Sequence, residues 1–186
     1  MSQVEGLTKK LMRSKILSRL KTQKEEDRDR KSRAIKTKLF RTKVFKKAKN
    51  VMFYIALKTE VNTEEMIKEA KKIGKNVTVP VCAGNRATLR PAILEDNARL
   101  KKGPYGVAEP ETQRYIRLED IDLVIVPGLA FDKKGRRLGR GKGCYDRFLK
   151  RLSKDTPAIG LAFDFQILPN VPSSPHDVNI RKVISN

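Results

Sequence analysis

The chain has 186 residues, of which 39% are hydrophobic and 34% charged, a length and composition that suit one globular domain at residues 1–186 and exclude two ordinary domains. Its longest apolar run, residues 51–57, is far shorter than the roughly 20 residues of a membrane span, and no signal peptide is visible. Cys82 and Cys144 have neither zinc-ligand spacing nor the density of a disulfide scaffold. We therefore expect a cytoplasmic protein without a membrane partner.

Positive charge is the unusual feature of the composition. The formal net charge is +21, and residues 1–50 hold 18 Lys and Arg against 5 Asp and Glu. Such an excess favours an anionic partner: nucleic acid, nucleotide phosphates or a polycarboxylate substrate. The alternative is that most of these side chains only solvate the exposed faces of helices.

Strand-like and helical segments alternate along the chain. Helical spacing predicts two helices in the first fifty residues, the second at 29–47, with a polar turn at 21–28. The remaining elements are expected as strands at 51–56, 77–81, 89–93, 121–126, 158–163 and 178–185, a capped helix start at 61–65 that continues to 72, an irregular loop at 95–115 and a helix at 144–152. This alternation predicts an α/β fold: a three-layer domain with a mostly parallel Rossmann-like sheet and helices on both faces, the basic residues 1–50 being part of the same domain.

A glycine-rich loop follows the most apolar strand and precedes a helix. Its glycines stand at positions 128, 135, 139, 141 and 143, interleaved with Arg137, Arg140 and Lys142. Glycines let backbone N–H groups converge on phosphate oxygens, and in parallel sheets ligands bind at the carboxyl ends of the strands. The loop lacks the Gly-Lys-Ser/Thr ending of a P-loop and the dinucleotide Gly-x-Gly-x-x-Gly spacing. The alternative to a phosphate site is a flexible turn, but the flanking strand, helix and cations favour a phosphate ligand such as that of ATP.

Asp146 stands at the start of the helix that follows the loop. A carboxylate there is suited to Mg²⁺ that bridges nucleotide phosphates. Spacing alone equally allows an acidic residue stabilised by the helix dipole.

The string Pro-Gly-Leu-Ala-Phe-Asp-x-x-Gly-x-Arg-Leu-Gly-x-Gly-Lys-Gly-x-Tyr-Asp, residues 127–146, strongly resembles the signature of the 5-formyltetrahydrofolate cyclo-ligase (methenyltetrahydrofolate synthetase) family. The resemblance extends over nearly the whole chain. Further similar segments are the Lys-x-x-x-Arg motif at 9–13, residues 53–65, the Gly-Val-Ala-Glu-Pro run at 106–110 and His-Asp at 176–177. This chain departs from the family pattern at Val81, Cys82, Ala108, Cys144, Arg181 and the final Ser185-Asn186.

The resemblance implies ATP-dependent conversion of 5-formyltetrahydrofolate to 5,10-methenyltetrahydrofolate, with release of ADP and phosphate. It implies that Ile55 and Glu60 bind the folate and that Asp146 and Asp177 face Mg²⁺. The residues implied to bind ATP are Lys9, Arg13, Arg137, Leu138, Gly139, Arg140, Gly141, Lys142, Gly143, Cys144 and Tyr145. Among these, Arg140, Lys142 and Tyr145 are the expected catalytic residues, although Tyr145 is equally suited to a buried structural role.

The expected partners are ATP and 5-formyltetrahydrofolate, and we expect a monomer. Polyglutamylated folates offer a second explanation of the basic surface, because long-range attraction would steer their tails. Two alternatives stay open: a nucleic-acid-binding protein on the same scaffold, or an ATP-dependent ligase or kinase for another small molecule. The chain has only 7 Phe and 4 Tyr, no Trp, and none of the common nucleic-acid modules, so nucleic acid is not the expected partner.

Overall fold

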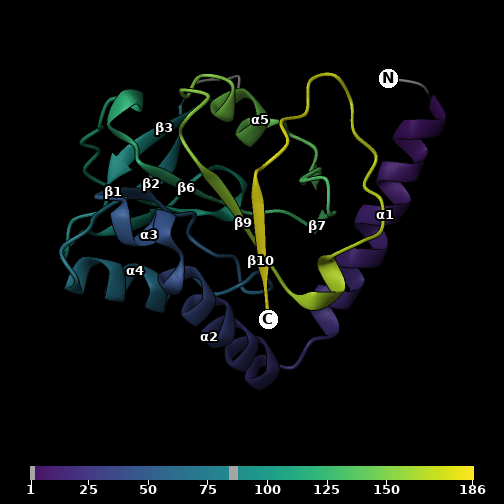
Figure 1. The fold of residues 1–186 in the computed structure, drawn as a ribbon, viewed down its shortest axis with the longest axis horizontal. Coiled ribbons are helices and arrows are strands. Elements are labelled where there is room, and N and C mark those ends of the chain that lie inside the picture. The colour runs from purple at the N-terminus through teal and green to yellow at the C-terminus, as the bar shows by residue number, and fades with distance from the viewer. Residues whose placement is uncertain (1–2, 84–87) are drawn as a thin grey trace.

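A six-stranded sheet forms the centre of the computed structural model, which describes residues 3–83 and 88–186 (Figure 1). Its strands are β1 (Asn50–Met52), β2 (Asn76–Ala83), β3 (Thr88–Ile93), β6 (Leu123–Val126), β9 (Ala158–Ala162) and β10 (Lys182–Ser185). Their order is β10-β9-β6-β1-β2-β3, and every neighbouring pair is parallel except β2 and β3. The prediction of a mostly parallel sheet is confirmed.

Strand β6 lies in the interior of the sheet, and its sequence explains why. All four of its residues are buried, as expected of a parallel strand that is covered on both faces. Leu123 and Ile125 pack into the core on one face, whereas Val124 and Val126 pack into the core on the other. The alternation of side chains along a strand thus divides one apolar run between two cores.

Helices cover both faces of the sheet, as predicted. They are α1 (Gln3–Thr22), α2 (Glu25–Arg41), α3 (Lys43–Lys47), α4 (Glu64–Lys72) and α5 (Cys144–Leu149), with 3₁₀ turns η1 (Pro104–Gly106), η2 (Leu118–Asp120) and η3 (Asp164–Gln166). Buried side chains of α1 to α4 join the core that contains Leu123 and Ile125, and Phe148 and Leu149 of α5 join the core on the other face. None of the helices in the described part of the chain has the length and apolar character needed to cross a bilayer.

The predicted helix boundaries in the basic first fifty residues were partly wrong. The polar turn expected at 21–28 is reduced to residues 23 and 24, because Lys, Glu and Arg are good helix formers and polarity alone does not mark a turn. The single helix expected at 29–47 is two helices that separate at Thr42. Thr42 has an extended backbone, and its side chain accepts a hydrogen bond from Phe45 N at 3.2 Å, which caps α3.

The region 95–115, expected to be irregular, contains a β-hairpin. Strand β4 (Leu100–Lys102) pairs antiparallel with β5 (Ala108–Pro110). Glu109 of β5 is buried and accepts a hydrogen bond from Cys82 N at 2.9 Å, so the hairpin is tied to the end of β2. The predicted strands at 51–56 and 178–185 are also shorter than expected, because only β1 and β10 find partners there.

Candidate active site

The first part of the glycine-rich loop is a second hairpin rather than a flexible turn. Strand β7 (Ala130–Phe131) pairs antiparallel with β8 (Arg137–Leu138), and Leu129 N donates to Leu138 O at 2.7 Å. Gly135, at the turn, has a φ of +77°, and an added Cβ would lie 2.0 Å from Ile180 O. Glycine is therefore required at 135 by both conformation and space.

Asp132 holds this hairpin together, a role that the sequence analysis missed. Its buried carboxylate accepts backbone hydrogen bonds from Lys134, Arg136 and Val171 and a 2.6 Å contact from Arg136 Nε. Burial opposes ionisation, but these donors outweigh it and lower the pKa of Asp132. An Asp followed three residues later by Gly is typical of a turn that the Asp side chain stabilises, so the sequence contained a pattern that could have predicted this role.

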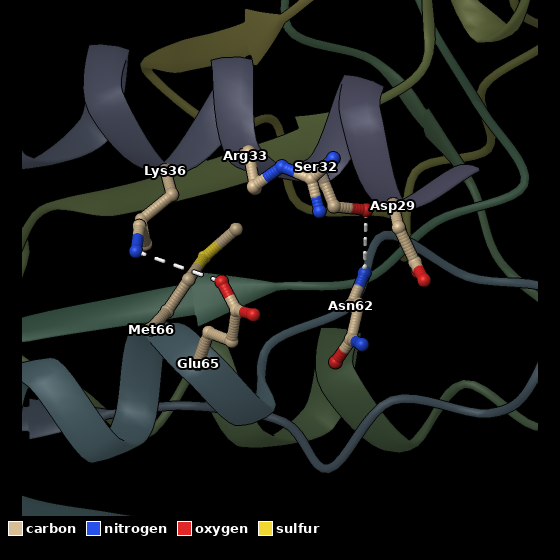
Figure 2. Close-up of a pocket in the computed structure, with 7 residues that line it drawn as sticks. All are labelled: Asp29, Ser32, Arg33, Lys36, Asn62, Glu65 and Met66. Carbon is tan, nitrogen blue, oxygen red and sulfur yellow. Dashed lines mark hydrogen bonds and ion pairs between the residues drawn. The ribbon is translucent and has the colours of Figure 1, made fainter. Parts of the chain in front are cut away.

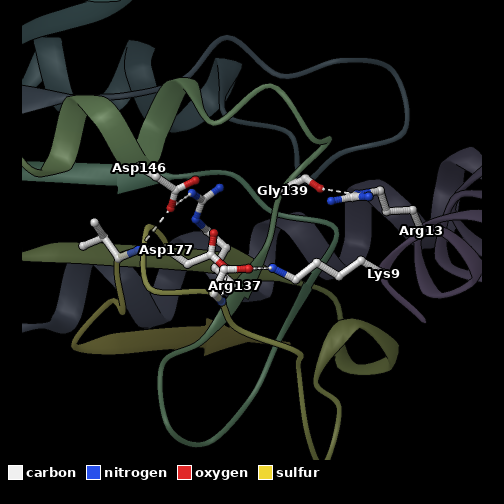
Figure 3. A network of polar contacts seen from close by, with 8 residues as sticks. Lys9, Arg13, Arg137, Gly139, Asp146 and Asp177 are labelled. Atoms are coloured by element: carbon white, nitrogen blue, oxygen red, sulfur yellow. Dashed lines mark hydrogen bonds and ion pairs between the residues drawn. The ribbon is translucent and has the colours of Figure 1, made fainter. Parts of the chain in front are cut away.

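Arg137 connects the loop to α5 and to the chain that precedes β10. Its guanidinium is buried and donates to Asp146 Oδ1 at 2.8 Å and to Pro127 O at 3.4 Å (Figure 3). Val178 N also donates to Asp146 Oδ1, at 3.2 Å. Within the described residues, Nε of Arg137 is buried without a hydrogen-bond partner. A buried donor of this kind beside a glycine-rich loop is suited to an anionic ligand.

The Lys-x-x-x-Arg motif lies on α1 and brings that helix to the loop. Figure 3 shows Lys9 and Arg13 reaching from α1 toward Asp177 and Gly139. Lys9 Nζ donates to Asp177 Oδ2 and to Ser174 Oγ, each at 2.8 Å, and Arg13 Nε donates to Gly139 O at 3.0 Å. Residues four apart lie on one face of a helix, so both motif residues reach the same site.

Asp177 is held in its charged form. Burial opposes ionisation of its carboxyl, but the hydrogen bonds from Lys9 and Ser174 N and the charges of Lys9 and Arg137 outweigh it and lower its pKa. Ser174 was missed as a site residue, because a serine in a Ser-Ser-Pro turn carries no distinctive spacing. The neighbouring His176 is exposed.

Asp146 and Asp177 form a donor set that fits Mg²⁺. They lie on adjacent segments, since the N–H of Val178 contacts Asp146 Oδ1. Asp146 contacts Arg137 through Oδ1, and Asp177 contacts Lys9 through Oδ2. Mg²⁺ in nucleotide sites takes oxygen ligands, commonly one or two carboxylates together with substrate phosphates. Two neighbouring carboxylates beside a phosphate-type loop meet that requirement.

Glu60 connects the predicted folate segment to the loop. Its Oε1 accepts hydrogen bonds from Arg140 Nη2 at 2.9 Å and Nε at 3.3 Å, and its Oε2 accepts one from Leu57 N at 3.1 Å. Tyr54, in the same segment, donates its hydroxyl to Val61 O at 3.0 Å. Glu60 is therefore held where the predicted folate segment meets the glycine-rich loop.

Helix α2 supports the folate segment from behind. Ser32 Oγ accepts a hydrogen bond from Asn62 N at 3.0 Å, and Lys36 Nζ lies 3.6 Å from Glu65 Oε2 (Figure 2). The cavity between these residues has a volume of about 50 Å³, which is too small for a nucleotide or a folate. Its polar groups serve the packing of α2 on the segment that precedes α4.

Ile55 borders a much larger groove along α4. The groove has a volume of about 1130 Å³, and its apolar lining includes Ile67, Leu94 and Leu100. Several charges of its lining are paired with each other: Lys71 Nζ lies 3.1 Å from Asp96 Oδ1, and Lys68 Nζ lies 2.7 Å from Glu64 Oε1. Its size is sufficient for a small-molecule ligand.

Tyr145, in the first turn of α5, is close enough to Glu60 and Arg137 to be influenced by both charges. Its hydroxyl is buried and has no hydrogen-bond partner among the residues described. Burial and the nearby charge of Glu60 raise the pKa of the phenol well above its usual range, so it stays protonated at neutral pH. The guanidinium of Arg137 lies 5.8 Å from the centre of its ring. Lys142 is exposed on the same loop, two residues before Cys144, the first residue of α5.

Comparison with known proteins agrees with this geometry. The model of the 5-formyltetrahydrofolate cyclo-ligase family matches residues 6–186. The chain belongs to this family. It is 30% identical to the 5-formyltetrahydrofolate cyclo-ligase of Mus musculus, over 95% of this chain and 92% of the relative. It is 36% identical to the probable 5-formyltetrahydrofolate cyclo-ligase of Schizosaccharomyces pombe, over 76% of each chain.

Solved structures extend the similarity to the fold. The 5,10-methenyltetrahydrofolate synthetase of Aquifex aeolicus superposes with a TM-score of 0.84 at 34% identity, covering 95% of this chain and 88% of that one. The resemblance of the sequence to the cyclo-ligase family is thus confirmed by the family model, the relatives and the fold. The structure gathers Lys9, Arg13 and the loop around Asp146 and Asp177, and the individual roles of these residues remain predictions.

Proposed function

We propose that this chain converts 5-formyltetrahydrofolate to 5,10-methenyltetrahydrofolate with consumption of ATP, and that the part of the glycine-rich loop after the hairpin turn, residues 137–143, binds the nucleotide. The observation that carries the assignment is that α1 contacts this loop through Arg13 and the nearby Asp177 through Lys9, and that the loop leaves the carboxyl end of β6. In parallel α/β sheets that edge is the usual place for a ligand. Membership of the cyclo-ligase family supplies the reaction.

The chemistry requires activation of an amide-like oxygen. The formyl oxygen attacks the γ-phosphorus, the bond to the β,γ-bridging oxygen breaks, and ADP leaves. N10 of the folate then attacks the formyl carbon, the carbon–oxygen bond breaks, phosphate departs and N10 loses its proton. Because both leaving groups are anionic, the protein contributes mainly positioning and charge neutralisation.

The side chains of the site have the properties that this chemistry needs. Arg140 and Lys142 bring positive charge to the loop, and the protonated phenol of Tyr145 can donate a hydrogen bond to a substrate oxygen. Glu60 offers a carboxylate to N–H donors of the pterin, and Ile55 offers an apolar contact. The residues assigned to ATP are those at 9, 13 and 137–145.

Asp146 and Asp177 are proposed to hold Mg²⁺, which when bound would neutralise charge on the nucleotide phosphates. Their own part is to present oxygen ligands from two segments that Arg137 and Lys9 hold in place. We further propose that the chain is a monomer. We also propose that it is cytoplasmic, since both cysteines are free thiols, as a reducing compartment would keep them.

Polyglutamylated folates are proposed as the preferred form of the substrate. The exposed Lys and Arg side chains of the first fifty residues would attract their tails at low ionic strength. The measurement is the Kd of a pentaglutamate and a monoglutamate folate at low and high salt. Equal affinities at low salt would refute this preference.

The first experiment is the ATP-dependent appearance of the conjugated methenyl product, followed by absorbance. We expect Lys142→Ala to lower kcat by about a hundredfold or more with unchanged folding, because it removes a charge that neutralises the transferring phosphoryl group. Lys133→Ala, which removes an exposed cation at the turn of the same loop, should retain activity. Absence of product in the wild type, beside ATP hydrolysis or tight RNA binding, would instead support one of the other functions considered for this scaffold.

A further inference from the structure

The contact between Arg140 and Glu60 links the two predicted substrate regions. Arg140 belongs to the nucleotide loop and Glu60 to the folate segment, 80 residues apart in the chain. Both oxygens of Glu60 accept hydrogen bonds from the protein itself: Oε1 from Arg140 and Oε2 from Leu57 N. A pterin N–H that binds Glu60 must therefore compete with one of these two donors.

Arg140 is the partner that can move. Its side chain is 43% exposed, whereas that of Glu60 is only 14% exposed. Arg140 stands between Gly139 and Gly141, and Gly141 has a φ of +101°, a conformation that L side chains rarely adopt. Glu60 is fixed in a tight turn, because its own N–H donates to Leu57 O at 2.9 Å while Leu57 N returns a hydrogen bond to Oε2. Because the guanidinium of this pair is exposed, water or another acceptor can replace Glu60 around it at little cost.

A triphosphate is a stronger acceptor for this guanidinium than a single carboxylate. Arginine binds phosphate oxygens through two parallel N–H groups, and the loop collects Arg13 and Lys142 beside Arg140. Nucleotide at the loop would thus draw Arg140 away from Glu60 Oε1. The oxygen that is released is the acceptor assigned to the folate.

We propose that Arg140 couples the two substrates: nucleotide binding removes its guanidinium from Glu60, and Glu60 then accepts the N–H donor of the folate. This inference rests on the proposed function, since it needs ATP at the loop and formylfolate at Glu60. Arg140 is a phosphate ligand and, through Glu60, a positioning residue for the second substrate. Because coupling is reciprocal, the folate also strengthens nucleotide binding by the same factor.

Calorimetric titration of the full chain with 5-formyltetrahydrofolate tests the coupling, with and without a non-hydrolysable ATP analogue and Mg²⁺. We expect the analogue to tighten folate binding about five- to tenfold in the wild type, at the lower end of usual coupling strengths. In Arg140→Met the analogue should have no effect on folate affinity, and folate should bind the free variant more tightly than the free wild type. Lys133→Met, a loss of one exposed cation from the same loop, should keep the full enhancement.

The decisive quantity is folate affinity without nucleotide. If Arg140 only binds phosphate, Arg140→Met leaves that affinity unchanged; if it only supports Glu60, the variant binds folate more weakly; either result overturns the coupling. Full enhancement by the analogue in Arg140→Met overturns it as well. A wild type that neither binds 5-formyltetrahydrofolate nor forms the methenyl product refutes the proposed function itself, and the two failures are thereby distinguished.

Discussion

Two arginines of the same loop differ in burial, although the carboxylates that they contact are similarly buried. The side chain of Arg137 is 4% exposed, and that of its partner Asp146 is 18% exposed. The side chain of Arg140, three residues later, is 43% exposed, and that of its partner Glu60 is 14% exposed. A buried ion pair that loses one partner is strongly destabilised, whereas water can take the place of an exposed guanidinium. The loop is therefore fixed at Arg137, and Arg140 is able to exchange partners.

Removing the buried arginine gives the largest expected effect on stability. Arg137→Ala leaves Asp146 without its guanidinium, and we expect the free energy of unfolding to fall by about 3–5 kcal/mol. Urea denaturation measures this loss. Arg114→Ala, which breaks an exposed pair with Glu95 in which the Arg114 side chain is 70% exposed, should cost less than about 1 kcal/mol. If both variants lose the same free energy of unfolding, burial does not decide how much each ion pair stabilises the fold.

The hairpin that carries Arg137 is expected to be nearly as sensitive. Gly135→Ala forces an L side chain to a φ of +77° and places its Cβ against Ile180 O, so we expect a loss of about 3 kcal/mol. Gly74 has a similar φ of +79°, but an added Cβ there meets nothing within 4 Å. Gly74→Ala should therefore lose only about 1 kcal/mol, from conformation alone. Thermal or urea unfolding of the two variants separates crowding from backbone strain, and similar losses would show that Ile180 yields freely.

The fold was predictable from sequence because its periodicities are local. The continuous apolar run at 121–126 indicated a strand buried on both faces, and β6 is one. The break at Thr42 was not predictable from periodicity, since it depends on a single side-chain cap. The hairpin between β4 and β5 was missed because glycine and proline mark turns without saying whether the flanking residues find a partner strand.

For the candidate site, the resemblance supplied the residues, but the contacts between them required the fold. The Lys-x-x-x-Arg motif is too short to predict a site alone, yet Lys9 lies 168 positions from Asp177 in sequence and 2.8 Å away in space. Likewise, no local pattern connects Arg140 to Glu60. Long-range ion pairs depend on how the elements pack, which the order of residues does not reveal by itself.

The pair of Lys9 and Asp177 should have an intermediate effect that depends on pH. The side chain of Lys9 is 7% exposed and that of Asp177 is 25% exposed, so Lys9→Met should cost about 2 kcal/mol at pH 7. The folded-state pKa of Asp177 lies below the unfolded value of about 3.9, so its stabilising contribution is present above that pH and is lost as pH falls through the lowered pKa. The stability difference between wild type and variant should therefore shrink on acidification. A difference that stays constant down to pH 2 would mean that Lys9 acts through Ser174 rather than through the charge of Asp177.

Arg140→Met should have the smallest effect on stability of all these changes. Glu60 is 14% exposed, but water can replace the exposed guanidinium at Oε1 and Glu60 keeps the hydrogen bond from Leu57 N, so we expect the free energy of unfolding to fall by less than about 1 kcal/mol. Urea denaturation of Arg140→Met beside Arg137→Met compares two arginines of one loop with the same replacement. A loss of several kcal/mol at Arg140 would make its ion pair a structural one, as at Arg137, and a guanidinium held that firmly cannot leave Glu60 when a nucleotide arrives. A negligible loss leaves the pair free to exchange, which is the property that the coupling of the two substrates requires.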